Sequence, residues 1–148
     1  MIVATGRFGA RRLGLALAQP EKSVVVISGD GEQLMGIGAL GTVAVKTAAN
    51  LTVVVLDNGH HGATGMQASH SSLGADLCGI AAGFGIPDAT HIIDQDGYDL
   101  LAKCINGRTG TTFAQVHIGT EEVPRALPSR DGVANKNSFR ASLRLPTF

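Results

Sequence analysis

Residues 23–31 read SVVVISGDG, and this stretch decides the fold because its β-branched run stops abruptly at Gly29. A run of Val and Ile that ends at a glycine turn is typical of a buried strand. Residues 9–19 are compatible with a helix that stops at Pro20. Residues 32–49 have helical length, with apolar residues at near-helical spacing. This order of helix, strand and helix predicts the start of an α/β sheet.

The same alternation continues along the rest of the chain. Strands that alternate with helices predict an α/β fold, with a doubly wound, mainly parallel sheet and helices on both faces. The further strands are expected at residues 51–56, 90–93 and 112–118, and the further helices at residues 75–84, 98–105 and 137–145.

The composition is consistent with one domain spanning residues 1–148. The chain is 44% apolar, lacks Trp and has 4% aromatic residues, so its core must consist of Val, Ile, Leu and Ala, which suits a covered parallel sheet. Lys plus Arg and Asp plus Glu each number 12, which gives no electrostatic reason to expect nucleic acid or a membrane as partner. Cys78 and Cys104 are too few for a disulfide framework or a thiolate cluster. We expect a cytoplasmic protein.

Two strand ends carry unusual residues, and ligands of open parallel sheets bind at the carboxyl ends of strands. Gly29-Asp30-Gly31 lies between a strand and a helix, where glycines let backbone N–H groups approach a phosphate. The acidic Asp30 contradicts a pure phosphate site unless a cation lies between the two, and Mg²⁺ is the natural choice for oxygen ligands.

The second strand end reads LDNGHHG over residues 56–62. Neighbouring strands lie about 5 Å apart, or about 10 Å with one strand between them. The amide oxygen of Asn58 can therefore complete the coordination that Asp30 begins. A GDG turn alone is a weak signal, since Asp-Gly is common in turns, but its combination with the DNG that follows the next strand is far more specific.

These two motifs resemble those of thiamine-diphosphate enzymes, in which GDG is followed by an Asn-containing pair. Residues 56–67 (LDNGHHGATGMQ) and 13–44 are similar to the beta chains of sulfopyruvate and phosphonopyruvate decarboxylases, and the resemblance covers residues 6–118. It implies a thiamine-diphosphate-dependent lyase of the 2-oxoacid decarboxylase type, with thiamine diphosphate and Mg²⁺ as cofactors. The cofactor's C2 carbanion would act as the electron sink for loss of CO₂.

The resemblance also assigns residues to the site. It implies that Asp30 and Asn58 bind Mg²⁺ through side-chain oxygens and that His60 does so through its backbone carbonyl. The implied cofactor-binding set is Gly29, Asp30, Gly31, Glu32, Gln33, Asn58, His60 and Gly62. For catalysis, His60, His61 and Thr64 are the candidates, whereas His91 and His117 are expected to be structural.

The family places the pyrimidine-binding half of the active site, with its activating glutamate, on a separate domain. Glu21, Glu32, Glu121 and Glu122 are the only glutamates of this chain, and none is a good candidate for that role. We therefore expect a partner subunit or self-association, no activity from this chain alone, and a small 2-oxo acid substrate that bears a sulfonate or phosphonate.

The beginning of the chain departs from the family pattern. Counted back from Pro20, the family's Met-Gly step falls on Thr5-Gly6, and Thr5 cannot fill the volume of the apolar side chain that wedges the bent cofactor. The family's first strand is also expected to be missing.

Other readings remain open. The chain could belong to a 2-oxoacid:ferredoxin oxidoreductase or to a carboligase, although two distant cysteines cannot hold the iron–sulfur cluster that often accompanies the former. It could also be a degenerate subunit that only binds a partner. A nicotinamide-binding module is disfavoured because no G-x-G-x-x-G follows a strand.

Overall fold

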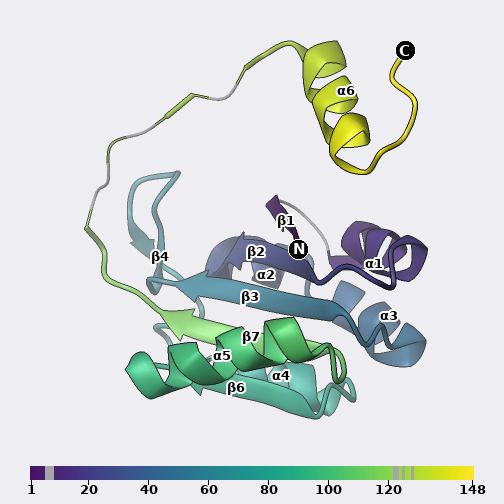
Figure 1. The fold of residues 1–148 in the computed structure, drawn as a ribbon. Coiled ribbons are helices and arrows are strands. Elements are labelled where there is room, and N and C mark those ends of the chain that lie inside the picture. Colours follow the sequence, from purple (N-terminus) through teal and green to yellow (C-terminus); the bar gives the residue numbers. More distant parts are fainter. Residues whose placement is uncertain (6–8, 122–123, 125, 128) are drawn as a thin grey trace.

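The protein, in a computed structural model that describes residues 1–5, 9–121, 124, 126–127 and 129–148, contains a five-stranded sheet whose neighbouring strands are all parallel (Figure 1). The strand order is β1-β2-β3-β7-β6, and β4 and β5 form a separate antiparallel pair. The strands are β1 (Ile2–Thr5), β2 (Val24–Gly29), β3 (Leu51–Asp57), β4 (His60–His61), β5 (Gln67–Ala68), β6 (Asp88–Ile92) and β7 (Thr112–His117). The helices are α1 (Gly9–Ala18), α2 (Asp30–Met35), α3 (Ala39–Lys46), α4 (Leu77–Gly83), α5 (Gln95–Gly107) and α6 (Gly132–Ser142).

Alternate residues of each central strand pack on opposite faces of the sheet. Val24, Val26 and Val53 belong to a large core that also includes residues of α1, α3 and α4. Val25 and Val54 belong to a smaller core with residues of α5. A strand that is buried on both faces needs apolar side chains at every position, which explains the unbroken runs of Val and Ile in the central strands.

The strand order explains why α5 covers the other face. The chain moves in one direction across the sheet from β1 to β3, continues to the edge strand β6, and then turns back to place β7 between β3 and β6. Right-handed connections put helices on one face while the chain moves one way and on the opposite face when it reverses. The expected doubly wound sheet with helices on both faces is confirmed (Figure 1).

One strand was not expected and one expected helix was wrong. Ile2–Thr5 form β1 and pair with β2 in parallel register, and the absence of the family's own first strand stays a prediction. The expected helix over residues 32–49 is two helices, α2 and α3, with Gly36 as the C-cap of α2 and Gly38 as the N-cap of α3. Glycines within a few residues weaken a helix by roughly 1 kcal/mol each, which explains the break.

The other expected elements are present with shifted ends. The expected helix over 98–105 begins earlier, as α5, because the Asp94 side chain caps it by accepting from the Gly97 N–H at 2.9 Å. The helix expected over 137–145 also begins earlier, as α6, with Asp131 accepting from the Val133 and Ala134 N–H groups.

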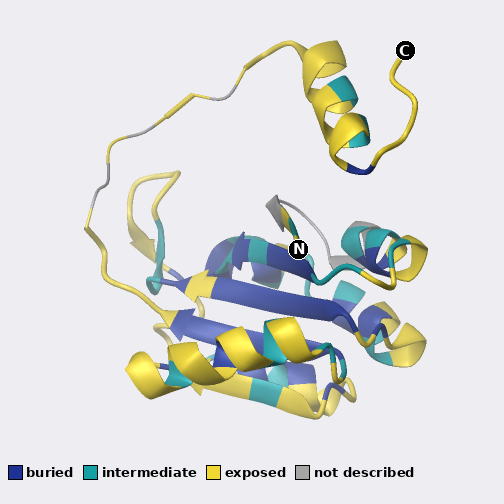
Figure 2. Ribbon diagram, in the orientation of Figure 1, coloured by how far each residue is buried: buried dark blue, intermediate teal, exposed yellow. Residues whose placement is uncertain are grey.

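The carboxy-terminal helix stands apart from the sheet. None of the described residues after Val116 belongs to either core, and α6 has no buried residue (Figures 1 and 2). In the part of the chain that the structure describes, no helix combines the length and apolar character needed to cross a bilayer.

Candidate functional site

The GDG turn lies at the carboxyl end of β2. This strand ends at Gly29, and α2 begins directly with Asp30, whose side chain is only 3% exposed. Gly29 pairs with Leu56 of β3, so the turn lies beside the residue at which β3 ends, Asp57. The predicted convergence of the two strand ends is therefore present.

Two serine hydroxyls hold the buried Asp30 carboxylate. Ser69 Oγ donates to Asp30 Oδ2, and Ser71 Oγ lies 3.0 Å from the same oxygen. Ser71 Oγ also lies 2.8 Å from Asp57 Oδ1 and 2.8 Å from Ser69 Oγ. A hydroxyl has one proton, so Ser71 can donate to only one of the two carboxylates at a time. The site therefore holds two acidic side chains bridged by one hydroxyl.

Asp57 is ionised although it is largely buried. Burial acts to raise the pKa of its carboxyl, but hydrogen bonds from Ser71, Gln115 and the Gly59 N–H outweigh that effect and hold the pKa below its usual value. Gln115 Nε2 lies 2.6 Å from Asp57 Oδ2, and the Gly59 nitrogen lies 2.8 Å from Oδ1. These bonds place a negative charge beside Asp30.

The GDG turn and the loop after β3 line one hollow of about 370 Å³. Most of the site residues predicted from the sequence line this hollow, and Met35 and Ala63 line it as well. The predicted residues that line it are Gly29, Asp30, Gly31, Glu32, His60, His61, Gly62 and Thr64.

Two predicted residues do not line this hollow. Gln33 is buried, with 5% of its surface exposed. Asn58 lines a neighbouring hollow of about 290 Å³ that also contacts Asp57, Ser71 and His117. Its Nδ2 nevertheless lies close to Gly62, 3.9 Å from the position that a Cβ would take there. Asn58 therefore lies at the border between the two hollows.

The oxygens predicted to bind magnesium in the second loop make hydrogen bonds within it. Asn58 Oδ1 accepts from the His60 N–H at 3.0 Å, and the His60 carbonyl accepts from the Gly62 N–H at 3.1 Å. A metal ion would take the place of these donors. The His60 ring donates from Nδ1 to the Asn58 carbonyl at 2.8 Å. Because a carbonyl only accepts, Nδ1 carries the proton and Nε2 of the neutral ring is left with its lone pair.

His61 packs directly on the GDG turn. A Cβ at Gly31 would lie 2.5 Å from His61 Nδ1, so this close approach requires glycine. His61 also borders a second hollow of about 320 Å³, together with Gly31 and His70. Thr64 Oγ1 contacts the His61 carbonyl at 3.3 Å and Gln67 Oε1 at 3.2 Å, which ties the loop together.

The donor set fits a divalent metal and a diphosphate. Carboxylate, amide and carbonyl oxygens are the ligands that Mg²⁺ prefers. Buried carboxylates usually pair with a cation or a metal, and here only neutral hydroxyls contact Asp30 in the hydrogen bonds described above. The glycines that line the hollow leave backbone N–H groups room to approach a phosphate.

The sequence analysis missed Ser69 and Ser71, the residues that bridge the two acids. The run SHSS at residues 69–72 is a signal that could have drawn attention, since hydroxyl side chains cluster there directly after the Gly-rich loop. The prediction on Thr5-Gly6 falls at the border of what the structure describes: Gly6 lies outside the described residues, as does the side chain of Thr5.

Comparison with known proteins gave consistent matches. The family model "Thiamine pyrophosphate enzyme, C-terminal TPP binding domain" matches residues 2–116. The sulfopyruvate decarboxylase subunit beta of Methanothermobacter thermautotrophicus is 35% identical over 126 residues, which cover 84% of this chain and 64% of that protein. The phosphonopyruvate decarboxylase of Streptomyces hygroscopicus is 45% identical over 85 residues, or 57% of this chain and 21% of that protein.

Solved structures agree at the level of the fold. The benzoylformate decarboxylase of Polynucleobacter necessarius superposes with a TM-score of 0.66 at 16% identity, over 84% of this chain and 31% of that one. The chain thus spans less than two thirds of the length of each of these proteins.

Proposed function

Since the chain belongs to the thiamine pyrophosphate enzymes, as a C-terminal TPP-binding domain, we propose that it is a subunit of a 2-oxoacid decarboxylase. In this role it binds Mg²⁺ and the diphosphate group of thiamine diphosphate. The observation that carries the proposal is the shared hollow. The GDG turn after β2 and the loop after β3 line it together, with the buried Asp30 carboxylate at its wall.

In this proposal the two loops divide the work of binding. Asp30, the Asn58 side chain and the His60 carbonyl hold Mg²⁺, and the backbone of Gly29 and Gly31 accommodates the diphosphate. The bound cofactor supplies the carbanion and electron sink that decarboxylation requires. Ser69 and Ser71 orient the Asp30 carboxylate through their hydroxyls.

The histidines of the loop would act on the substrate side. His60 has its Nδ1 proton committed to the Asn58 carbonyl, which leaves Nε2 free to accept a hydrogen bond. His61 and Thr64 line the same hollow and stand as the other candidates for contact with the reacting groups. The names of these relatives favour a 2-oxo acid that bears a second acidic group, as sulfopyruvate and phosphonopyruvate do.

A second polypeptide would complete the active site. The family's activating glutamate has no good counterpart here, since Glu21 is 92% exposed at its side chain and lies 4.0 Å from Arg108 on the surface. Glu32 lines the hollow on the diphosphate side. We take residues 1–148 as one domain, completed by a pyrimidine-binding chain or by self-association. Two free cysteines favour the reducing cytoplasm as its location.

Calorimetric titration with thiamine diphosphate, with and without Mg²⁺, tests the binding site. We expect binding that depends on Mg²⁺ and that falls at least about tenfold in Asp30→Asn, because the substitution removes the charge but preserves the shape of the side chain. Asp96→Asn is the matched control, since Asp96 is exposed on α5, away from the hollow. Binding that is equal in the two variants would refute the proposed site.

Release of CO₂ from 2-oxo acids tests the reaction. The chain is assayed alone and mixed with a pyrimidine-binding partner chain, and activity is expected only in the mixture. Activity of the chain alone would overturn the two-chain arrangement. Tight cofactor binding without turnover in the mixture would instead identify a binding subunit that has lost catalysis.

A further inference from the structure

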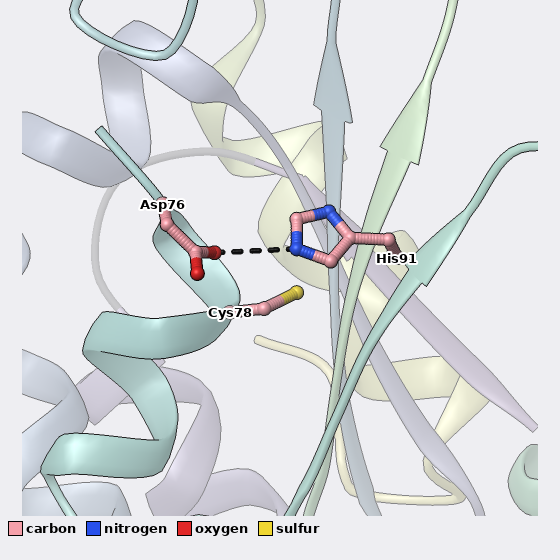
Figure 3. Close-up of side chains that lie close together, drawn as sticks. All are labelled: Asp76, Cys78 and His91. Carbon is pink, nitrogen blue, oxygen red and sulfur yellow. Dashed lines mark ion pairs between the residues drawn. The ribbon is translucent and has the colours of Figure 1, made fainter. Parts of the chain in front are cut away.

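A second group of metal-ligand residues lies outside the candidate cofactor site, where α4 begins against β6. Asp76 is the N-cap of α4, Cys78 lies in its first turn, and His91 extends from β6 toward both of them (Figure 3). One ligand atom from each residue lies within 4.8 Å of the others, and Asp76 Oδ1 is 3.2 Å from His91 Nε2.

The three residues supply one sulfur, one nitrogen and one oxygen, a combination that suits zinc. Zn²⁺ binds at about 2.3 Å to sulfur and about 2.0–2.2 Å to nitrogen and oxygen, which sets tetrahedral ligand atoms roughly 3.4–3.6 Å apart. The 3.2 Å between Asp76 Oδ1 and His91 Nε2 is already close to that spacing, and all three ligand atoms lie within 4.8 Å of one another. The side chains of Asp76 and His91 are exposed, whereas Cys78 is buried in the core. We propose that Asp76, Cys78 and His91 form a binding site for Zn²⁺ or a similar transition metal, with its fourth position open to water.

His117 supports the proposal as the partner of the ligand histidine. His91 Nδ1 lies 3.3 Å from His117 Nε2, and the two rings stack with centroids 5.6 Å apart. A metal-bound histidine usually donates its other ring N–H to an acceptor that fixes its tautomer. With His91 Nε2 on the metal, its Nδ1–H can donate to His117 Nε2. Without metal, the other tautomer donates from Nε2 to Asp76.

Asp76 can serve the helix and the metal at the same time. Its Oδ1 accepts from the Gly79 N–H at 2.9 Å, which caps α4, and the same oxygen lies 3.2 Å from His91 Nε2, where its second lone pair can bind a metal. The hydrogen bond from Gly79 and the neighbouring His91 hold the pKa of Asp76 below its usual value, so the side chain is ionised at neutral pH.

Cys78 must lose its proton to bind. Burial raises the pKa of this thiol to about 11, so it is protonated in the metal-free protein at neutral pH. On binding, the S–H bond breaks, the metal–sulfur bond forms and the proton goes to solvent.

The ligand chemistry separates this site from the candidate cofactor site. The hollow around Asp30 offers carboxylate, amide and carbonyl oxygens, which favour Mg²⁺. The group around Cys78 offers thiolate and imidazole, which favour zinc and cobalt. Excess Mg²⁺ should therefore occupy the first site and leave the second one available.

Zinc and cobalt titrations of the whole chain in excess Mg²⁺ test the proposal. We expect one equivalent of Zn²⁺ to bind in competition with a chromophoric chelator. With Co²⁺ we expect a thiolate-to-cobalt charge-transfer band in the near ultraviolet and the visible absorption of a four-coordinate ion. Cys78→Ser and Asp76→Asn remove one ligand each, and asparagine preserves the helix cap. Cys104→Ser removes the other thiol and is the matched control.

The expected result is a loss of at least about tenfold in zinc affinity for Cys78→Ser and Asp76→Asn, with unchanged affinity for Cys104→Ser. The charge-transfer band should vanish in Cys78→Ser alone. The proposal is overturned if Cys78→Ser binds zinc as tightly as Cys104→Ser, or if the cobalt protein lacks the thiolate band. Thermal melts of the metal-free variants show that each is folded, so that lost affinity reports on the ligands.

Discussion

At the scale of single residues, Gly29 and Gly31 are two glycines of one turn in very different surroundings. An added Cβ at Gly29 would meet nothing within 4 Å, whereas one at Gly31 would lie 2.5 Å from the His61 ring. We expect Gly29→Ala to keep the free energy of unfolding within about 0.5 kcal/mol and Gly31→Ala to lower it by about 1–3 kcal/mol. Urea unfolding of the two variants measures the difference.

The cause of the Gly31→Ala effect can be isolated with a second change. His61→Ala removes the ring that the new Cβ would displace. In the double variant, the additional loss caused by Gly31→Ala should fall below about 0.5 kcal/mol, because the two side chains no longer collide. An undiminished loss would show that the alanine strains the backbone of the turn instead.

Asn50 is a second residue whose role can be measured. Its Nδ2 lies 3.1, 3.0 and 2.8 Å from the carbonyls of Ala16, Gln19 and Lys22, which share its two protons and join the end of α1 to the start of β3. We expect Asn50→Ala to lower the free energy of unfolding by about 1–3 kcal/mol, because buried carbonyls lose their donor.

Asn106→Ala is the matched control for Asn50. The exposed Asn106 donates to the Ala102 carbonyl at 2.9 Å within α5, and water can replace that bond. Its loss should change the free energy of unfolding by about 0.5 kcal/mol or less. Equal effects of the two substitutions in urea titrations would contradict the role given to Asn50.

Some residues of the candidate cofactor site could be predicted from the sequence, and others could not. Gly29, Asp30 and the loop after β3 could be predicted because each motif is a run of adjacent residues and the two motifs follow successive strands. Ser71 could not be found in that way, since its contact with Asp30 joins residues 41 positions apart and depends on how the loop folds back. The grouping of His91 with Asp76 and Cys78 was missed for the same reason: His91 was expected to be structural, and Asp76 was not considered.

At the scale of elements, Thr111 connects the start of β7 to the turn before β3. Its buried hydroxyl accepts from the Ala48 N–H at 3.1 Å and donates to the Ala48 carbonyl at 3.1 Å. We expect Thr111→Val, which has nearly the same shape, to lower the free energy of unfolding by about 1–3 kcal/mol because the buried Ala48 N–H loses its partner.

Thr111→Ser separates the hydroxyl from the methyl group. The serine preserves both hydrogen bonds. The decrease in the free energy of unfolding should therefore be close to the contribution of one buried methyl group, about 1 kcal/mol. Chemical denaturation of the two variants provides the measurement. A serine variant that is as unstable as the valine variant would assign the effect to packing.

The elements themselves were predictable wherever one strong pattern decided them. Strands β2 and β3 are unbroken β-branched runs, and any reading of residues 24–28 and 51–56 gives strands. Strand β1 was missed because four residues carry too little pattern, and its place in the sheet depends on hydrogen bonds to β2. The helix starts at Asp94 and Asp131 were missed because the search followed apolar spacing and gave no weight to capping aspartates.

At the scale of the whole molecule, α6 forms a local unit with the end of the chain. Arg140 Nε donates to the Pro146 carbonyl at 2.6 Å, and its guanidinium lies 4.5 Å from the centroid of the Phe148 ring. The contact with the sheet is slight: Phe139 and Ser142 border a hollow of about 320 Å³ beside residues 1–3 of the β1 edge. The last residues of the two core clusters are Phe113 and Val116.

This arrangement predicts that residues 1–120 fold without the rest of the chain. Removal of residues 121–148 should lower the free energy of unfolding by less than about 1 kcal/mol, because neither core loses a side chain. The Mg²⁺-dependent affinity for thiamine diphosphate should also be unchanged, since every residue that lines the candidate hollow lies between Gly29 and Thr64. Urea unfolding and calorimetric titration of the shortened chain measure the two quantities. Loss of cooperative unfolding would show that α6 completes the core at the β1 edge, and loss of cofactor affinity from a folded shortened chain would show that the tail contributes to the site.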